Sequence, residues 1–189
     1  MSKEKILFFG FVALLFSISC NARKQSLNNI SELQTNLDSV LSNNPILTPE
    51  QKLHADELIA AYSEFVEKFP EDSLSAKFLF ETSRLKLMIP DYPAALEVLA
   101  SIPEKYPADE QAPIALSTAA SLCENVLQDC NKAEEYLKQL KEKYPDHPTA
   151  VNIDLQIEYV CDPQGYLEAV RGGIMEKDSV ASELINTPK

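Results

Sequence analysis

A four-residue segment occurs three times in this chain at nearly constant spacing. Glu67-Lys68-Phe69-Pro70 returns as Glu104-Lys105-Tyr106-Pro107 and as Glu142-Lys143-Tyr144-Pro145, so the copies lie 37 and 38 residues apart. Such a period is typical of helical-repeat proteins, in which each unit buries its apolar face by stacking on its neighbours. We therefore expect an all-α fold in which each copy ends the second, or B, helix of a helical hairpin, because proline forbids a further turn.

Capping signals predict where several helices begin. Thr48 and Gln51 form a capping-box pattern around Pro49, which predicts the B helix of an incomplete leading unit. Other expected caps are Asp72 and Asp109 for the first, or A, helices of two units, and Asn131 with Glu134 for a B helix. Two further expectations are an early end or a kink at Pro103 and a continuous helix over 147–159.

Composition excludes several classes of protein. No glycine lies between Phe11 and Gln164, whereas nucleotide-binding loops and tight β-hairpins depend on glycine. The formal net charge is −12, and no basic patch with interleaved aromatic residues occurs. We therefore expect no nucleic-acid partner.

The first residues have the pattern of a secretory signal peptide. Lys3 and Lys5 precede an apolar run from Ile6 to Ile18, with small residues at Ser17 and Ser19. As a helix this run would reach only about 20 Å, whereas a membrane-spanning helix must cross about 30 Å of hydrocarbon. We expect residues 1–19 to be a signal peptide that is removed on export.

Cys20 follows Ser19, just after this run. Ser17-Ile18-Ser19-Cys20 resembles a bacterial lipobox, with Ser17 at the position where leucine is usual. The resemblance implies that Cys20 becomes the lipidated first residue of the mature protein and carries several acyl chains, palmitate among them, which suffices for stable anchoring. The alternative is cleavage at the same bond by the ordinary signal peptidase, since Ser17 and Ser19 also form a small-x-small site.

The stretch from Asn21 to Asn44 is rich in Asn, Ser and Gln but carries apolar residues at helical spacing, beginning with Leu27 and Ile30. We interpret it as a tether followed by an amphipathic helix. Its apolar stripe is expected to dock on the first repeat. The alternative is a short coiled coil with another chain, for which fewer than three heptads are present.

Alanine marks the predicted helix crossings, and proline follows each B helix. The alanines are Ala76, Ala95, Ala112, Ala133 and Ala150. From about Leu53 to Val170 the chain resembles the tetratricopeptide repeat, which implies helical hairpins forming a short right-handed superhelix. Residues 91–96 and 106–113 resemble two envelope families, the lipoprotein of the outer-membrane β-barrel assembly machinery and the cell-division coordinator that works with the Tol-Pal system. Both families are non-enzymatic scaffolds.

Candidates for chemistry are few. His54 and His147 lie near helix ends and outside any metal-ligand spacing, which favours capping or solvated roles over metal binding. The acidic pairs lie at helix starts, where they complement the helix dipole. No nucleophile, base and oxyanion site come together, so we expect neither an enzyme nor a metal or organic cofactor beyond the lipid on Cys20.

Three cysteines remain after Cys20, and export implies an oxidising compartment. Cys130 lies fifteen residues before Pro145 and Cys161 sixteen after it, so both should lie at the same end of two antiparallel helices. We predict a Cys130–Cys161 disulfide, which stabilises the fold by about 3 kcal/mol. The alternatives are a Cys123–Cys130 disulfide and three free thiols.

The A-helix face is the expected binding surface. The nine groove candidates stand seven, eleven or fourteen residues after the proline that ends each copy of the repeated segment. They are Lys77, Ile114 and Asn152 at seven residues, Glu81, Thr118 and Gln156 at eleven, and Arg84, Ser121 and Tyr159 at fourteen. Arg84 and Tyr159 are the expected anchors by residue type. The alternative is an ordinary solvated helix face.

These features predict four segments and one class of function. The segments are a signal peptide over 1–19, a lipid-anchored tether and amphipathic helix over 20–47, a helical repeat domain over 48–173 and a C-terminal capping segment over 174–189. The predicted function is a non-enzymatic envelope scaffold that binds a protein or peptide partner, with outer-membrane protein assembly as the implied process. The alternative is a periplasmic peptide- or cell-wall-binding coordinator of envelope constriction and division. The residues after Cys20 are not acidic, which by resemblance to sorting rules favours the periplasmic face of the outer membrane.

Overall fold

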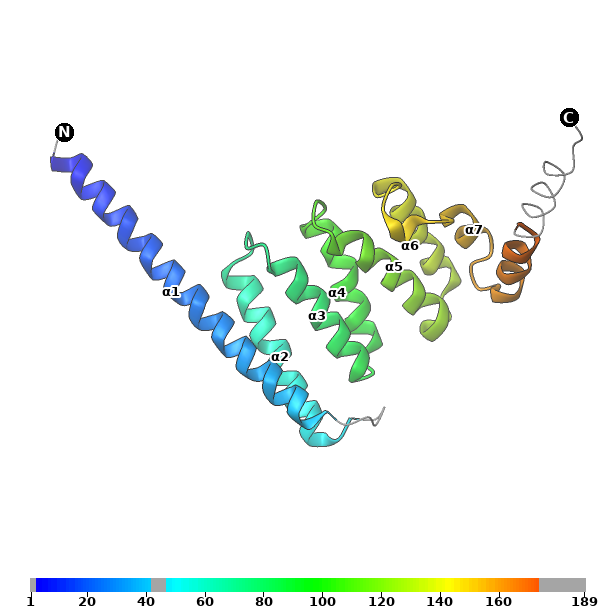
Figure 1. Cartoon of the computed structure of the whole chain (residues 1–189), viewed down its shortest axis with the longest axis horizontal. Coiled ribbons are helices and arrows are strands. Elements are labelled where there is room, and N and C mark those ends of the chain that lie inside the picture. Colours follow the sequence, from blue (N-terminus) through cyan, green and yellow to red (C-terminus); the bar gives the residue numbers. More distant parts are fainter. Residues whose placement is uncertain (1–2, 42–46, 174–189) are drawn as a thin grey trace, which may run out of the picture. The chain divides into compact units, whose positions relative to one another are not determined.

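A computed structural model describes residues 3–41 and 47–173, and every regular element in these ranges is a helix (Figure 1). The all-α prediction is therefore confirmed for the described chain. The chain forms two compact units, Met1–Gln111 and Ala112–Lys189. The predicted C-terminal capping segment over 174–189 lies outside the described residues.

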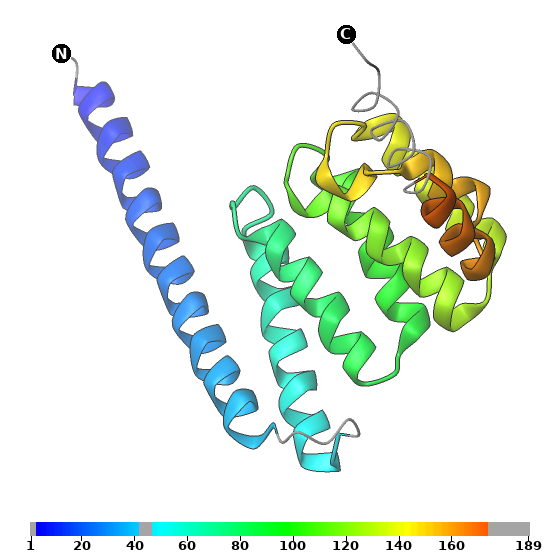
Figure 2. The same cartoon turned by 45° about the vertical axis from the view of Figure 1, so that its right-hand side comes forward.

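The first unit is a row of antiparallel helices (Figures 1 and 2). They are α1 (Lys3–Val40), α2 (Pro49–Lys68), α3 (Ser75–Met88) and α4 (Tyr92–Lys105). Helix α1 packs on α2, α2 on α3, and α3 on α4. Three aromatic rings lie at the centre of the core, where Phe78 stacks on Tyr62 at 4.9 Å between ring centroids and meets Phe65 edge-on at 4.8 Å.

Helix α1 completes the leading hairpin. Its Ile30 and Leu37 are each 3% exposed and belong to the same core as α2, so the predicted docking on the first repeat is confirmed. The tether predicted at the start of 20–47 is wrong for the described residues, because the helix is continuous from residue 3 to residue 40. The polar composition after Cys20 is outweighed by the apolar stripe, which has α2 to pack against.

The second unit combines α-helices with a π-helical turn and a 3₁₀ turn. Its elements are α5 (Gln111–Leu122), a π-helical turn (Cys123–Leu127), α6 (Cys130–Lys143), a 3₁₀ turn (Pro148–Ala150), α7 (Ile153–Glu158) and a helix over 163–173. A small core joins α5, α6 and α7, with Leu116 and Leu140 fully buried at its centre. The five alanines predicted at helix crossings are all buried, at 6% exposure or less.

All three copies of the repeated segment end a helix with the same backbone geometry. The aromatic residues Phe69, Tyr106 and Tyr144 have φ values of −133°, −131° and −137°, and ψ values of 57°, 58° and 51°. Each aromatic N–H donates to the carbonyl four residues earlier, at 2.8, 2.8 and 2.9 Å. Each aromatic carbonyl then accepts from the N–H three residues later, which turns the chain toward the next element. The prediction that each copy ends a helix is confirmed.

The structure confirms some of the predicted helix caps and corrects others. Thr48 and Gln51 form the predicted capping box. Asp72 and Asp109 each accept a hydrogen bond from the N–H two residues later, at 3.0 and 2.9 Å, so they close the turn before α3 and α5 instead of standing at the N-cap itself. This local side-chain to backbone turn is a common role of aspartate.

The cap predicted for α6 is wrong. The N-cap is Asp129, whose carboxylate accepts from the Lys132 N–H at 3.1 Å, and not Asn131. Glu134 pairs instead with Lys138 at 2.7 Å, one helical turn later. A carboxylate at the N-cap both accepts this hydrogen bond and complements the helix dipole, which explains why the helix starts one residue after Asp129.

Two predictions about helix continuity differ from the structure. The early end at Pro103 is wrong, because α4 continues through this buried proline to Lys105 and only one turn remains to be distorted. The continuous helix over 147–159 is also wrong. Val151 is extended and Asn152 is left-handed at φ 57°, a conformation that asparagine tolerates better than most residues, so the 3₁₀ turn and α7 are separate.

We expect Leu37→Ala to lower the free energy of unfolding by about 2–4 kcal/mol, because it removes buried side-chain atoms at the α1–α2 contact. The matched control is Asn36→Ala on the exposed side of the same helix, which should change stability by less than about 0.5 kcal/mol. Urea unfolding of the mature protein in detergent measures both. Equal stability of the two variants would show that α1 does not dock in solution.

Candidate functional site

Within the residues that the structure describes, each unit contains a hollow between two A helices. In the first unit it lies between α1 and α3, has a volume of about 390 Å³, and is called the α1–α3 hollow. In the second unit it lies between α5 and α7, has a volume of about 440 Å³, and is called the α5–α7 hollow. Because the sequence places the expected binding surface on the A-helix face, these hollows are the candidate sites.

Aliphatic side chains form much of the α1–α3 hollow, and charged groups line part of it. Its lining residues are Gln34, Leu37, Asp38, Leu41, Leu58, Tyr62, Glu81, Arg84, Leu85 and Met88. Gln34 Nε2 donates to Tyr62 Oη at 2.7 Å, and this link joins α1 to α2 beside the hollow. Arg84 Nη1 lies 3.1 Å from Glu81 Oε2. Burial raises the pKa of Tyr62, so its hydroxyl stays protonated at neutral pH.

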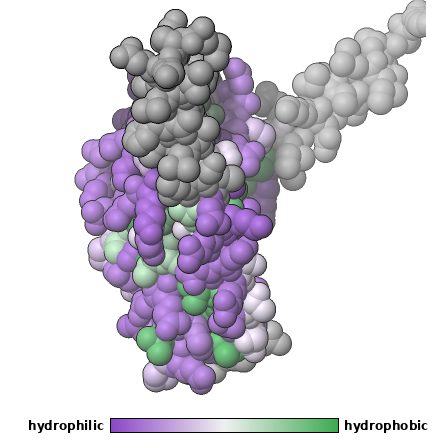
Figure 3. All heavy atoms as spheres, turned by 90° about the vertical axis from the view of Figure 1, so that its left-hand side faces the viewer, coloured by the Kyte–Doolittle hydropathy of each residue, from purple (hydrophilic) through white to green (hydrophobic). Residues whose placement is uncertain are grey.

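The surface on the side of α1 is mostly hydrophilic, with small hydrophobic patches between polar side chains (Figure 3). On the part of this face that grey atoms leave visible, the hydrophobic patches do not join into a continuous groove. The polar part of the α1–α3 hollow, with Asp38, Glu81 and Arg84, matches this character.

The α5–α7 hollow is more aromatic and carries fewer charges. Its lining residues are Ser117, Ala120, Ser121, Glu124, Asn125, Leu137, Gln156, Tyr159, Pro163, Tyr166 and Leu167. None of these described lining residues is Lys or Arg. Leu167 is 54% exposed although it is a large aliphatic residue. The mixture of tyrosines, an exposed leucine and amide side chains is typical of a surface that holds an apolar group and orients it by hydrogen bonds.

A disulfide holds one wall of the α5–α7 hollow. Cys130 and Cys161 are bonded, with an S–S distance of 2.12 Å and a Cα–Cα distance of 5.9 Å, and this is the pairing that the offsets from Pro145 predict. The Cys161 N–H also donates to Glu124 Oε1 at 2.8 Å. The segment from Tyr159 to Leu167 is therefore fixed to the rest of the unit at Cys161.

Cys123 has a free thiol and is fully buried, so the alternative Cys123–Cys130 pairing is not formed. Burial raises the pKa of the Cys123 thiol. Because the thiolate is the reactive form, Cys123 should be unreactive in the folded protein.

The structure places five of the nine predicted groove residues in one or the other of the two hollows. Glu81 and Arg84 line the α1–α3 hollow, and Ser121, Gln156 and Tyr159 line the α5–α7 hollow. The other four, Lys77, Ile114, Thr118 and Asn152, line neither hollow. Asn152 misses the register because it forms the left-handed break before α7.

The sequence did not point to the residues that complete each hollow. Asp38 was not expected because α1 was not identified as an A helix. Tyr166 and Leu167 were not expected because they lie on the helix over 163–173, outside the A-helix positions from which the groove candidates were taken. The signal available for it was Asp162–Pro163, a pattern typical of a helix start.

The histidines have local roles. His147 Nδ1 accepts from the Thr149 N–H at 3.2 Å and caps the 3₁₀ turn. His54 Nδ1 lies 3.4 Å from Glu57 Oε2, without hydrogen-bond geometry. Over the residues that the structure describes, no group of side chains could hold a metal ion. Within the same ranges, no helix has both the length and the apolar content needed to cross a membrane.

No family model matches the chain, and no curated protein matches its sequence. Any functional assignment therefore rests on the two hollows, the disulfide and the amino-terminal pattern.

Thiol counting tests the disulfide, the burial of Cys123 and the modification of Cys20 together. We expect the folded, unreduced mature protein to react slowly or not at all with a thiol reagent. After denaturation without reductant we expect one thiol, that of Cys123. A second thiol would show that Cys20 is unmodified, and three thiols from residues 123, 130 and 161 would contradict the disulfide.

Proposed function

We propose that this protein is a non-enzymatic scaffold of the bacterial cell envelope, anchored by lipid on Cys20, that binds a protein or peptide partner in its A-helix hollows. The hairpins are proposed to be tetratricopeptide-type units that form a short right-handed superhelix. The observation that carries this proposal is the recurrence of the hollow at equivalent repeat positions. Glu81 and Gln156 stand eleven residues after their unit's proline, Arg84 and Tyr159 stand fourteen after, and all four line a hollow.

The chemistry of the α5–α7 hollow favours a peptide segment with an aliphatic or aromatic anchor. Tyr159 and Tyr166 offer apolar ring surface with a polar tip, and Gln156 offers an amide that can bond a partner's backbone. The lack of Lys and Arg in the described lining, together with the formal charge of −12, disfavours an anionic ligand.

The lipid anchor and the location are supported by the lipobox-like segment before Cys20 and by the non-acidic residues after it. The proposed location is the outer membrane, facing the periplasm, and the proposed process is outer-membrane protein assembly. Coordination of envelope constriction through a peptide or cell-wall polymer is the alternative. An outer-membrane assembly component bound in the hollows would support the first role, and a wall polymer the second.

Cys20→Ala is expected to abolish incorporation of labelled palmitate and to move the protein out of the membrane fraction, because Cys20 is the proposed acylation site. Cys123→Ala is the matched control and should keep both properties, since Cys123 is fully buried. Metabolic labelling and membrane flotation measure the two outcomes. Labelled Cys20→Ala protein would contradict the anchor.

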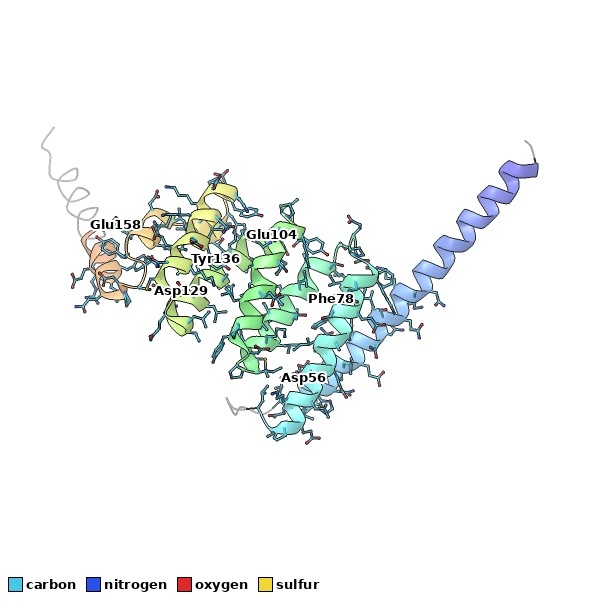
Figure 4. The ribbon with its side chains drawn as sticks, turned by 180° about the vertical axis from the view of Figure 1, so that it is seen from behind. Asp56, Phe78, Glu104, Asp129, Tyr136 and Glu158 are labelled. Carbon is cyan, nitrogen blue, oxygen red and sulfur yellow. A yellow bond between two sulfur atoms is a disulfide. The ribbon has the colours of Figure 1, made fainter. Side chains whose placement is uncertain are left out.

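Tyr159→Ala and Arg84→Ala are expected to reduce cross-linking to the partner in native envelopes without lowering the melting temperature. Both side chains line a hollow and are not fully buried. The controls are Glu158→Ala, labelled in Figure 4, and Lys77→Ala, which are exposed residues next to Tyr159 and on the same helix as Arg84 but outside the lining. A fall in melting temperature would assign the tyrosine or the arginine to the core instead.

A further inference from the structure

An ion pair fixes the docked part of α1 at its beginning. Arg23 Nη2 donates to Asp72 Oδ1 at 3.1 Å, and Arg23 Nε donates to the other oxygen of the same carboxylate. The Asp72 side chain is only 12% exposed and also accepts from the Leu74 N–H. The hydrogen bond from Arg23 lowers the pKa of Asp72 from its usual value of 3.8, so the pair stays ionised at any pH above that value.

From Arg23 onward α1 is held along its length. Ile30 and Leu37 enter the core, and the Val40 carbonyl accepts from Gln51 Nε2 at 2.6 Å. Helix α2 has 20 residues and α1 has 38, which correspond to about 30 Å and about 57 Å. An antiparallel partner of that length covers only the carboxyl-terminal half of α1, and the other half runs beyond the end of α2 (Figures 1 and 2). The boundary falls close to Arg23.

We propose that the loop over 69–74 faces the lipid surface and that the Arg23–Asp72 pair holds the first unit there without a flexible tether. The inference rests on the lipid anchor of the proposed function. Cys20 precedes Arg23 by three residues, so its Cα lies within about 10 Å of the Arg23 Cα whether the intervening chain is helical or fully extended. An acyl-anchored Cys20 therefore brings residue 23, and with it Asp72, close to the headgroups.

The end of the first unit that faces the membrane is built from two copies of the repeated segment. Helices α2 and α4 both run toward this end (Figure 1), and the Tyr106 hydroxyl interacts with Ser75 at the start of α3. The α1–α3 hollow lies farther away. Asp38, in its lining, stands fifteen residues after Arg23, which places it about 22 Å along the helix from the membrane-facing end. A partner in this hollow would be held beside the membrane without entering it.

The experiment measures quenching of a fluorophore by a spin-labelled lipid headgroup, which acts only at short range. The lipidated full-length mature protein is placed in vesicles of phosphatidylethanolamine and phosphatidylglycerol. The fluorophore is attached through Ser73→Cys in the loop, or through Met88→Cys at the other end of α3, about 20 Å away. Both positions are exposed, and the buried Cys123 thiol is not labelled in the folded protein. We expect several-fold stronger quenching of the Ser73→Cys probe.

Variants separate the pair from the anchor. Arg23→Gln should reduce the difference between the two probes, because the chain becomes free up to the apolar contacts of Leu27 and Ile30. Lys24→Gln removes the same charge from the neighbouring exposed residue and should leave the difference unchanged. A short Gly-Ser insertion between Cys20 and Arg23, which leaves the pair intact, should also reduce quenching at the loop.

Each outcome decides a different point. Protein that does not float with the vesicles would overturn the lipid anchor, and the inference with it. Protein that floats but shows equal quenching at the two probes would overturn the inference and leave the proposed function standing. If Arg23→Gln and Lys24→Gln behave alike, or if the insertion has no effect, the pair does not hold the first unit at the membrane.

Discussion

The backbone hydrogen bond that closes each helix before a proline determines the rest of the structure. Phe69, Tyr106 and Tyr144 each donate to the carbonyl four residues earlier and then accept from the N–H three residues later. The first bond completes the helix, and the following proline has no N–H with which to continue it. Because the same turn recurs every 37 or 38 residues, the next element starts from an equivalent backbone geometry in every unit. The sequence repeat thus reflects a recurring pattern of backbone hydrogen bonds. The glutamate and lysine before each aromatic residue are exposed.

A constant helix end does not give a constant surface. The positions eleven and fourteen residues after the repeat proline carry Glu81 and Arg84 in the first compact unit. In the second compact unit they carry Gln156 and Tyr159. In the first unit the two side chains pair with each other across one helical turn, whereas in the second they stand beside Tyr166 and Leu167. The spacing of the repeat therefore specifies where a hollow forms, and residues outside the repeat pattern specify its chemistry. The two hollows therefore differ in the chemistry of their linings while the hairpins remain alike.

The sequence predicted the features that depend on short local patterns. The repeat located the three helix ends, the capping pattern located the Thr48–Gln51 box, and the offsets from Pro145 located the disulfide. Prediction failed where tertiary packing competes with local preference. The polar composition after Cys20 indicated a tether, yet packing of Ile30 and Leu37 on α2 keeps α1 helical and makes it the missing A helix. The break at Asn152 gave no signal, because asparagine is compatible with a helix interior and adopts the left-handed conformation only where the surrounding chain requires it.

The second unit depends on its disulfide more than on the length of its helices. Helix α7 has 6 residues, too few to be stable by itself in water, and the core it joins is built largely from alanine, leucine and isoleucine. The Cys130–Cys161 bond closes a sequence separation of 31 residues, and a loop of that length corresponds to about 3–4 kcal/mol of stabilisation. That contribution is comparable to the stability a small core can supply, and it acts on the segment that carries Tyr159 and Tyr166. In a reducing compartment the wall of the α5–α7 hollow would lose this constraint, because disulfides persist only in oxidising environments.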